Sequence, residues 1–206
     1  QEQQLGRNRL TLPSPAVPLL LLVVTLAHSA PLGTPQTSDW TQILVRSQSL
    51  VQKILQSLVQ IHAQIVTSPG LTFDHSGHAP ELHLMMSQLQ IPTPPLLKPL
   101  SPSFTQDCVR RMWEGLEQQQ RIVGELSSKQ STLSDLHADL SDLKGQVATV
   151  TMGVVNSSPV QSESSILINL HGDYETEVAV HLMLTTLRTF CQDLRRSLRT
   201  LESQPV

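Results

Sequence analysis

The sequence predicts an all-α protein: a left-handed four-helix bundle with up-up-down-down topology, two long crossover loops and a short helix in the first crossover. Four long stretches carry apolar residues at steps of three and four, and the connections between them run long, short, long. An apolar stripe at this spacing lies along one side of a helix and must be buried against similar stripes. The four stretches are Asp39–Val66, Phe104–Leu126, Leu133–Val154 and Val180–Leu201.

The lengths of the connections decide the directions of the helices. A helix of about 25 residues is about 38 Å long. The gap Ser127–Ser131 is too short to cross that distance, so the second and third stretches must run antiparallel. The segments Thr67–Ser101 and Val155–Gly172 can cross it at about 3.3 Å per residue. Two long crossovers around a short turn define the up-up-down-down arrangement.

The first helix is expected to follow the Pro- and Gly-bearing segment Ala30–Thr37, which has no periodicity. Ser38 or Asp39 can cap it by accepting from the free N–H groups of its first turn. Pro69-Gly70 ends this helical region. Its stripe consists of Trp40, Ile43, Ser47, Leu50, Ile54, Leu58, Ile61 and Ile65.

The first crossover contains a short helical pattern, Glu81–Leu89, between Ala79-Pro80 and Ile91-Pro92. The prolines that follow enforce an extended path, because proline removes a backbone donor and clashes with the preceding turn. Pro102 suits the first turn of the second helix.

The remaining helices follow from their stripes and stop signals. Ser127-Ser128 ends the second, and Ser131 or Thr132 starts the third. In the Ser-rich second crossover we expect one apolar segment, Ile166–Leu170, to pack against the bundle. The three stripes consist of Phe104, Cys108, Met112, Leu116, Gln119, Val123 and Leu126; of Leu133, Leu136, Leu140, Leu143, Val147, Val150 and Val154; and of Val180, Leu184, Leu187, Cys191, Leu194, Leu198 and Leu201.

An apolar run near the start of the sequence predicts a secretory signal peptide over residues 1–29. Arg7 and Arg9 precede the run Val17–Ala27, and the small residues Ser29 and Ala30 follow it. A basic region, a short apolar region and small residues at a cut site make up such a peptide. The alternative is an uncleaved anchor, which we disfavour because a run of 11 residues is too short to span a bilayer.

The chain from residue 30 to residue 206 is long enough for one domain with a sizeable core. We expect this domain to be secreted and extracellular, a monomer when free, and not inserted into a membrane. The formal net charge is −3, and no basic block or aromatic–basic interleaving occurs, which disfavours nucleic acid as a partner.

The two cysteines, Cys108 and Cys191, both fall on apolar stripes and are expected to point inward. In the predicted topology their helices are antiparallel, which places the sulfurs at different heights. A disulfide tolerates only about 7 Å between Cα atoms. We therefore favour two buried thiols over a disulfide, which stays as the alternative.

Motifs of chemistry are sparse. The loop histidines His75 and His78, with His83 nearby, have no Cys or acid at ligand spacing, so a solvated loop is favoured over a metal site. No nucleophile elbow, phosphate loop or HExxH motif occurs, and we expect no catalysis, metal or cofactor. Asn156 begins an Asn-Ser-Ser sequon in a polar loop, a candidate glycosylation site whose occupancy the sequence leaves open.

Charged rows on two helices are the more informative candidates. Asp135, Asp139 and Asp142 are spaced by four and three, and form one acidic stripe opposite the leucines. Arg46 and Lys53, seven apart, form a basic row on the first helix. Both rows could serve solubility alone. In a secreted bundle without catalytic groups, exposed charges can instead steer a partner and set specificity.

Several segments resemble the granulocyte colony-stimulating factor family of long-chain helical cytokines. They are the crossover segment Gly77–Pro92, with its Glu-Leu start and Ile-Pro exit, the segments Ala30–Gly33 and Val51–Ile54, and the third-helix segment Thr132–Leu143. Together these segments are spread over most of the chain after residue 30. The second crossover and the fourth helix match the family in pattern only.

The resemblance implies a secreted growth factor that activates a class I cytokine receptor and promotes granulocyte proliferation and differentiation. The family's first receptor surface lies on the first and third helices, which carries over to Arg46, Lys53, Asp139 and Asp142. Its acidic contact on the first helix falls at Ser49 here.

The family's second receptor surface centres on the glutamate that opens the crossover helix, here Glu81, with Leu84 one turn further on. The disulfides of mammalian members are missing, since Gly77 stands where one cysteine would be. The chain therefore resembles a divergent, non-mammalian vertebrate member.

Two rival functions stay open at this point. One is another long-chain helical cytokine, interleukin-6-like or leptin-like, on the same scaffold, which receptor identity would distinguish. The other is a helical lipid-binding secreted protein. That alternative needs wide apolar stripes with a Lys/Arg flank, and the Ser- and Gln-rich outer faces argue against it.

Overall fold

The computed structural model describes residues 35–73, 80–97, 105–150 and 165–203. Within these ranges the protein is all-helical and contains no strand. The helices are α1 (Pro35–Ile65), α2 (Pro80–Gln88), α3 (Thr105–Ser127), α4 (Ser134–Val150) and α5 (Asp173–Glu202), with the 3-10 helices η2 (Ser131–Leu133) and η3 (Ile166–Asn169). The predicted signal peptide, residues 1–29, lies outside the described residues. None of the helices in these ranges is both long and apolar enough to span a bilayer.

Two helices begin earlier than the sequence predicts. Helix α1 starts at Pro35, so the expectation of a non-helical segment up to Thr37 is wrong for its last residues. Proline suits a first helical turn, because its missing N–H has no partner there. Helix α5 starts at Asp173, two turns before Val180, with Asp173 and Glu175 in its first turn. Acidic residues at a helix N-terminus are stabilised by the backbone dipoles, although they lie outside the apolar stripe.

The predicted stripes of α3, α4 and α5 are buried wherever the structure describes them. Phe104 and Val154 lie outside the described residues. On α1 three predicted members, Trp40, Ile43 and Leu50, are only half-buried, whereas Leu44 and Val51 are fully buried in place of Ile43 and Leu50. Helix α5 goes further than one stripe, because every residue from Val178 to Leu184 is buried. A helix that is apolar all round must be covered on all sides.

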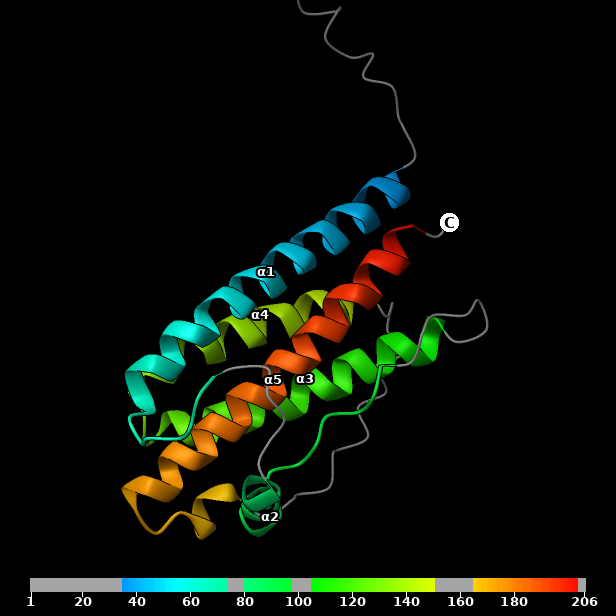
Figure 1. Cartoon of the computed structure of the whole chain (residues 1–206). Coiled ribbons are helices and arrows are strands. Elements are labelled where there is room, and N and C mark those ends of the chain that lie inside the picture. The colour runs from blue at the N-terminus through cyan, green and yellow to red at the C-terminus, as the bar shows by residue number, and fades with distance from the viewer. Residues whose placement is uncertain (1–34, 74–79, 98–104, 151–164, 204–206) are drawn as a thin grey trace, which may run out of the picture. The chain divides into compact units, whose positions relative to one another are not determined.

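Side-chain pairs join the long helices that Figure 1 labels. Between α1 and α5, Gln48 bonds to Glu202, Gln52 to Arg195 and His62 to His181, so the positions fall in reverse order along the two helices. Between α1 and α4 the order is also reversed. There Ser47 bonds to Gln146, and Lys53 bonds to Asp139.

The start of the first crossover is fastened to α5. The Glu177 carboxylate accepts from the backbone N–H groups of Thr67 and Ser68 at 3.1 and 2.8 Å, and from the Thr67 hydroxyl at 2.9 Å. The hydrogen bonds from the Ser68 and Thr67 side chains, with those from the backbone, lower the pKa of Glu177 to about 2. This anchor therefore stays charged at every ordinary pH.

The apolar segment of the second crossover packs as predicted only in part, because Ile168 is 67% exposed. Ile166, the first residue of η3, is fully buried. The Glu125 carboxylate on α3 holds it by accepting from the Ser165 hydroxyl at 2.9 Å and from the Ile166 N–H at 2.8 Å.

One close approach of α3 to α5 depends on a glycine. A Cβ at Gly115 would lie 2.5 Å from two ring atoms of Phe190 and 3.4 Å from a ring carbon of Pro95. A side-chain carbon cannot approach that closely, so the buried Phe190 ring lies directly on the α3 backbone.

Gln119 is a polar member of the buried α3 stripe. It is almost fully buried, and its side-chain amide has no hydrogen-bond partner among the residues that the structure describes. Burying an amide without partners costs about 1–3 kcal/mol.

Replacing Gln119 by Leu should therefore stabilise the protein. We expect Gln119→Leu to raise the free energy of unfolding by about 1–3 kcal/mol, because the penalty is removed and the volume is kept. Chemical denaturation monitored by circular dichroism measures it. The control is Gln56→Leu at an exposed position of α1, which should stay within about 0.5 kcal/mol of the unmodified protein. A loss of stability in Gln119→Leu would mean that the amide has partners in solution.

Both cysteines are free and buried, as favoured above. A hydrogen bond from the Ser197 side chain to Cys108 places that thiol six residues along α5 from Cys191, a rise of about 9 Å. Burial raises the pKa of Cys108, and it raises the pKa of Cys191 to about 12. Neither thiol is a reactive thiolate in the folded protein.

We expect a thiol reagent such as dithionitrobenzoate to react with two cysteines in denaturant and with neither in buffer at pH 8. Counting released thiolate against time measures this directly. Fast labelling of Cys191 in buffer would contradict the buried position. A peptide map showing a Cys108–Cys191 linkage would contradict the free state.

Candidate functional site

The candidate site predicted on the first and third long helices lies across α1 and α4. We call the three aspartates Asp135, Asp139 and Asp142 on α4 the acidic face. The Lys53 ammonium on α1 donates to Asp139 Oδ1 at 2.6 Å, so one member of the predicted basic row meets one member of the acidic stripe.

The predicted exposure is right for two aspartates and wrong for the third. Asp135 and Asp142 are exposed. The Asp139 side chain is only 13% exposed, whereas that of Lys53 is 65% exposed. Asp139 comes three residues after Leu136 and one before Leu140, both buried, so it lies at the edge of the apolar stripe and under the lysine stem.

The local field on this face is acidic even with the lysine in place. The hydrogen bond and charge of Asp139, with the charges of Asp135 and Asp142, raise the pKa of Lys53. Three carboxylates surround one ammonium, so the face can offer Asp135 and Asp142 to a cationic partner.

The other predicted members of this surface lie on α1. Arg46 and Ser49 are exposed. The Ser49 hydroxyl donates to the Val45 carbonyl at 3.0 Å, a bond within its own helix that a partner can displace. One residue from Arg46, Ser47 is buried and donates to Gln146 at 3.2 Å, which fixes α1 against α4 below the exposed residues.

The second predicted surface lies on α2. Leu84 is 61% exposed, one of several large apolar side chains at the surface of the described residues. Glu81 falls within α2, but its side chain lies outside the described residues. Asn156, His75 and His78 also lie outside them. Among the described residues no group of three His, Cys, Asp or Glu side chains could hold a metal ion.

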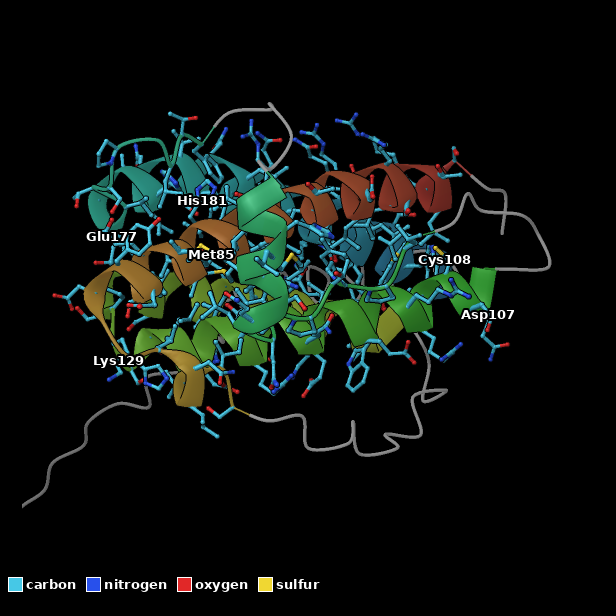
Figure 2. The ribbon with its side chains drawn as sticks, turned by 60° about the horizontal axis from the view of Figure 1, so that its bottom comes forward. Met85, Asp107, Cys108, Lys129, Glu177 and His181 are labelled. Atoms are coloured by element: carbon cyan, nitrogen blue, oxygen red, sulfur yellow. The ribbon has the colours of Figure 1, made fainter. Side chains whose placement is uncertain are left out.

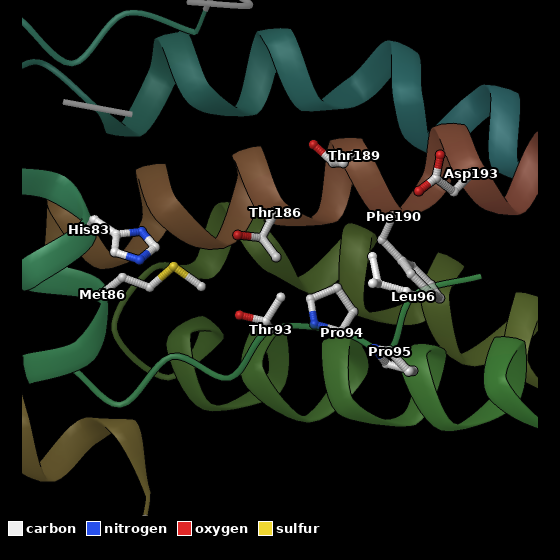
Figure 3. Close-up of a pocket in the computed structure, with 10 residues that line it drawn as sticks. All are labelled: His83, Met86, Thr93, Pro94, Pro95, Leu96, Thr186, Thr189, Phe190 and Asp193. Carbon is white, nitrogen blue, oxygen red and sulfur yellow. The ribbon is translucent and has the colours of Figure 1, made fainter. Parts of the chain in front are cut away.

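A pocket of about 260 Å³ lies between α2, the segment 93–96 and α5, and no sequence pattern predicted it. Figure 3 shows His83 and Met86 from α2 at one end and Asp193 from α5 at the other. The wall is formed by Thr93, Pro94, Pro95, Leu96, Thr186, Thr189 and Phe190. The prolines predicted an extended path for this part of the first crossover. They did not predict that it runs beside α5.

Cross-helix ion pairs were also missed, since spacing within one helix cannot reveal a partner on another. The Lys144 ammonium on α4 lies 2.5 Å from the Glu117 carboxylate on α3. This pair joins α3 to α4, whereas the Lys53–Asp139 pair joins α1 to α4. Helix α4 therefore has a separate ion pair to each of these two neighbours.

A search of protein-family models finds no family that matches this chain. A comparison with curated proteins finds no match either.

Proposed function

We propose that this chain is a secreted cytokine or growth factor that binds and activates a class I cytokine receptor. The particular proposal is a divergent member of the granulocyte colony-stimulating factor family that promotes granulocyte proliferation and differentiation. The observation that carries it is the acidic face on α4, joined to α1 by the Lys53–Asp139 pair. The family resemblance of the crossover around α2 adds to it.

We further propose the up-up-down-down, left-handed arrangement for the four long helices. The reversed order of the α1–α5 and α1–α4 pairs supports it. The short connection between α3 and α4 supports it as well, because it leaves those two helices antiparallel neighbours.

In this proposal, charges at the edge of the first receptor surface attract the receptor, and the Lys53–Asp139 pair at its centre determines which receptor binds. Asp135 and Asp142 are exposed carboxylates that attract basic receptor residues and accelerate encounter. Lys53 and the mostly buried Asp139 form the centre. There an acidic receptor residue can bind Lys53, or a basic receptor residue can take the place of Lys53 beside Asp139. Arg46 and Ser49 complete the surface on α1.

The second receptor chain is proposed to bind at α2. Leu84 supplies an exposed apolar anchor, and Glu81 opens the same helix. Apolar anchors surrounded by polar groups dominate the energy of many interfaces. An interleukin-6-like or leptin-like cytokine would use the same scaffold. Binding to a panel of receptor ectodomains distinguishes these from the preferred family.

Reversing the exposed charges tests the first surface. We expect Asp135→Lys/Asp142→Lys to weaken binding to the receptor ectodomain by about 1–3 kcal/mol, because like charges across an interface repel. Surface plasmon resonance measures the dissociation constant, and the helical circular dichroism signal should be unchanged. Asp173→Lys, an exposed aspartate at the start of α5, is the matched control and should bind normally. Equal binding of all three proteins would leave the acidic face a solubilising surface.

The second surface is tested by separating binding from signalling. We expect Glu81→Ala and Leu84→Ala to keep the first binding step within about twofold and to reduce a receptor-driven reporter response by about tenfold or more. The reason is that the second receptor chain joins after the first. Gln88→Ala, exposed on the same helix, should signal normally. Normal signalling by both variants would remove α2 from the receptor interface.

A further inference from the structure

Two buried histidines form a polar contact that the proposed receptor surfaces do not use. His62 on α1 is 6% exposed and His181 on α5 is 4% exposed. Nε2 of His62 lies 2.9 Å from Nδ1 of His181. Figure 2 labels His181 on α5 and Glu177, which lies one turn earlier on the same helix.

The pair also holds the beginning of the first crossover. The Phe73 ring stacks on His62 with a centroid distance of 4.8 Å and an interplanar angle of 28°. The Arg188 guanidinium lies 4.9 Å from the Phe73 centroid and donates to the Phe73 carbonyl at 3.3 Å. Residues 66–73, which we call the latch segment, are therefore attached to α1 and α5 through these rings.

The hydrogen bond sets a limit on protonation. One ring nitrogen must donate and the other must accept, so the pair can hold its bond when both rings are neutral or when they share one additional proton. With two additional protons both facing nitrogens carry hydrogen, and the rings must separate. Burial lowers the pKa of His62, because it disfavours the imidazolium.

Charged groups on α5 near the pair are engaged by other partners. Glu177 is engaged by Thr67 and Ser68, and its depressed pKa, about 2, keeps it ionised far below neutrality. Arg188 adds positive charge on the side of Phe73. A pH response between about 5 and 7 therefore cannot come from Glu177.

Within the described residues, several charged groups on the neighbouring helices are engaged by other partners. Helix α1 has no other ionisable side chain between Ile54 and Ile65. On α2, the exposed His83 lies near α5. On α3, which packs against α5, Glu117 bonds to Lys144 and Arg121 bonds to Glu125. On α4, His137 faces Gly124 of α3.

We propose that the His62–His181 pair is an acid-sensitive latch, which holds the latch segment against α1 and α5 at neutral pH and releases it when both imidazoles become protonated. The latch is independent of the receptor proposal, and its test needs no receptor. The sign follows from linkage: the unfolded or opened chain binds protons first as the pH falls, so the attachment is complete above the ordinary histidine pKa of about 6.5 and is lost progressively below it.

Hydrogen exchange of four amides reports the latch. The N–H of Val66 donates to the His62 carbonyl, those of Thr67 and Ser68 donate to Glu177, and that of Leu71 donates to the Ser68 carbonyl. Between pH 7 and pH 5, after correction for intrinsic exchange, we expect their protection to fall by up to about tenfold per pH unit for each histidine kept neutral. The amides of the buried α4 residues Leu140 and Leu143 serve as the internal reference and should change less.

Variants assign the effect to the pair. In His62→Leu/His181→Leu the protection of the four amides should be the same at both pH values, because nothing in the cluster then titrates in that range. His83→Gln, at the exposed histidine of α2, should behave like the unmodified protein. Unchanged protection in the unmodified protein would overturn the latch, and so would an equal loss in the double variant.

A measurement on the unmodified protein decides the matter if the double variant does not fold. Imidazole nitrogen shifts should show His62 neutral at about pH 6.5, where an ordinary histidine is half protonated. Its protonation at lower pH should coincide with the loss of protection at Val66 and Thr67. Protonation of His62 with these amides still protected would contradict the proposal.

Discussion

Two turns in the first half of α5 are buried on every side, and this constraint organises the other elements. From Val178 to Leu184 no residue reaches solvent, including His181. Two neighbouring helices cannot cover the whole circumference of a third, so the crossovers must help. The latch segment lies on one side, held by Glu177 and Phe73, and α2 packs on another. The long first crossover is therefore part of the core, not merely a connection between helices.

The sequence predicts the buried face of a helix well where the helix packs along one face, and less well where it packs against several neighbours. The stripes of α3 and α4 were predicted correctly because their members repeat at steps of three and four on one face. On α1 the burial of Leu44 and Val51 was missed, since that helix packs against both α4 and α5 and its stripe is wider than one line. The early starts of α1 and α5 were missed because the first turns of these helices carry no periodic signal.

For the candidate site, residue types were predictable and contacts were not. Spacing placed Asp135, Asp139 and Asp142 on one face, but only tertiary structure brings Lys53 over Asp139. This ion pair is screened by solvent, because the Lys53 side chain is 65% exposed. It therefore adds little to holding α1 on α4, where buried Ser47 and the leucines dominate. The same weakness leaves its charges available to a partner at small cost.

The contact of Phe190 with Gly115 has a consequence for how this protein can change. A glycine within a helix costs about 1 kcal/mol relative to alanine, so substitution at position 115 would ordinarily favour α3. Any side chain there displaces the Phe190 ring, and the ring also lines the pocket beside α2. The pocket beside α2 offers free space into which the displaced Phe190 ring can move. A substitution at Gly115 would thus change the shape of the pocket beside α2. The stability of α3 and the shape of this surface therefore cannot be adjusted independently in this chain.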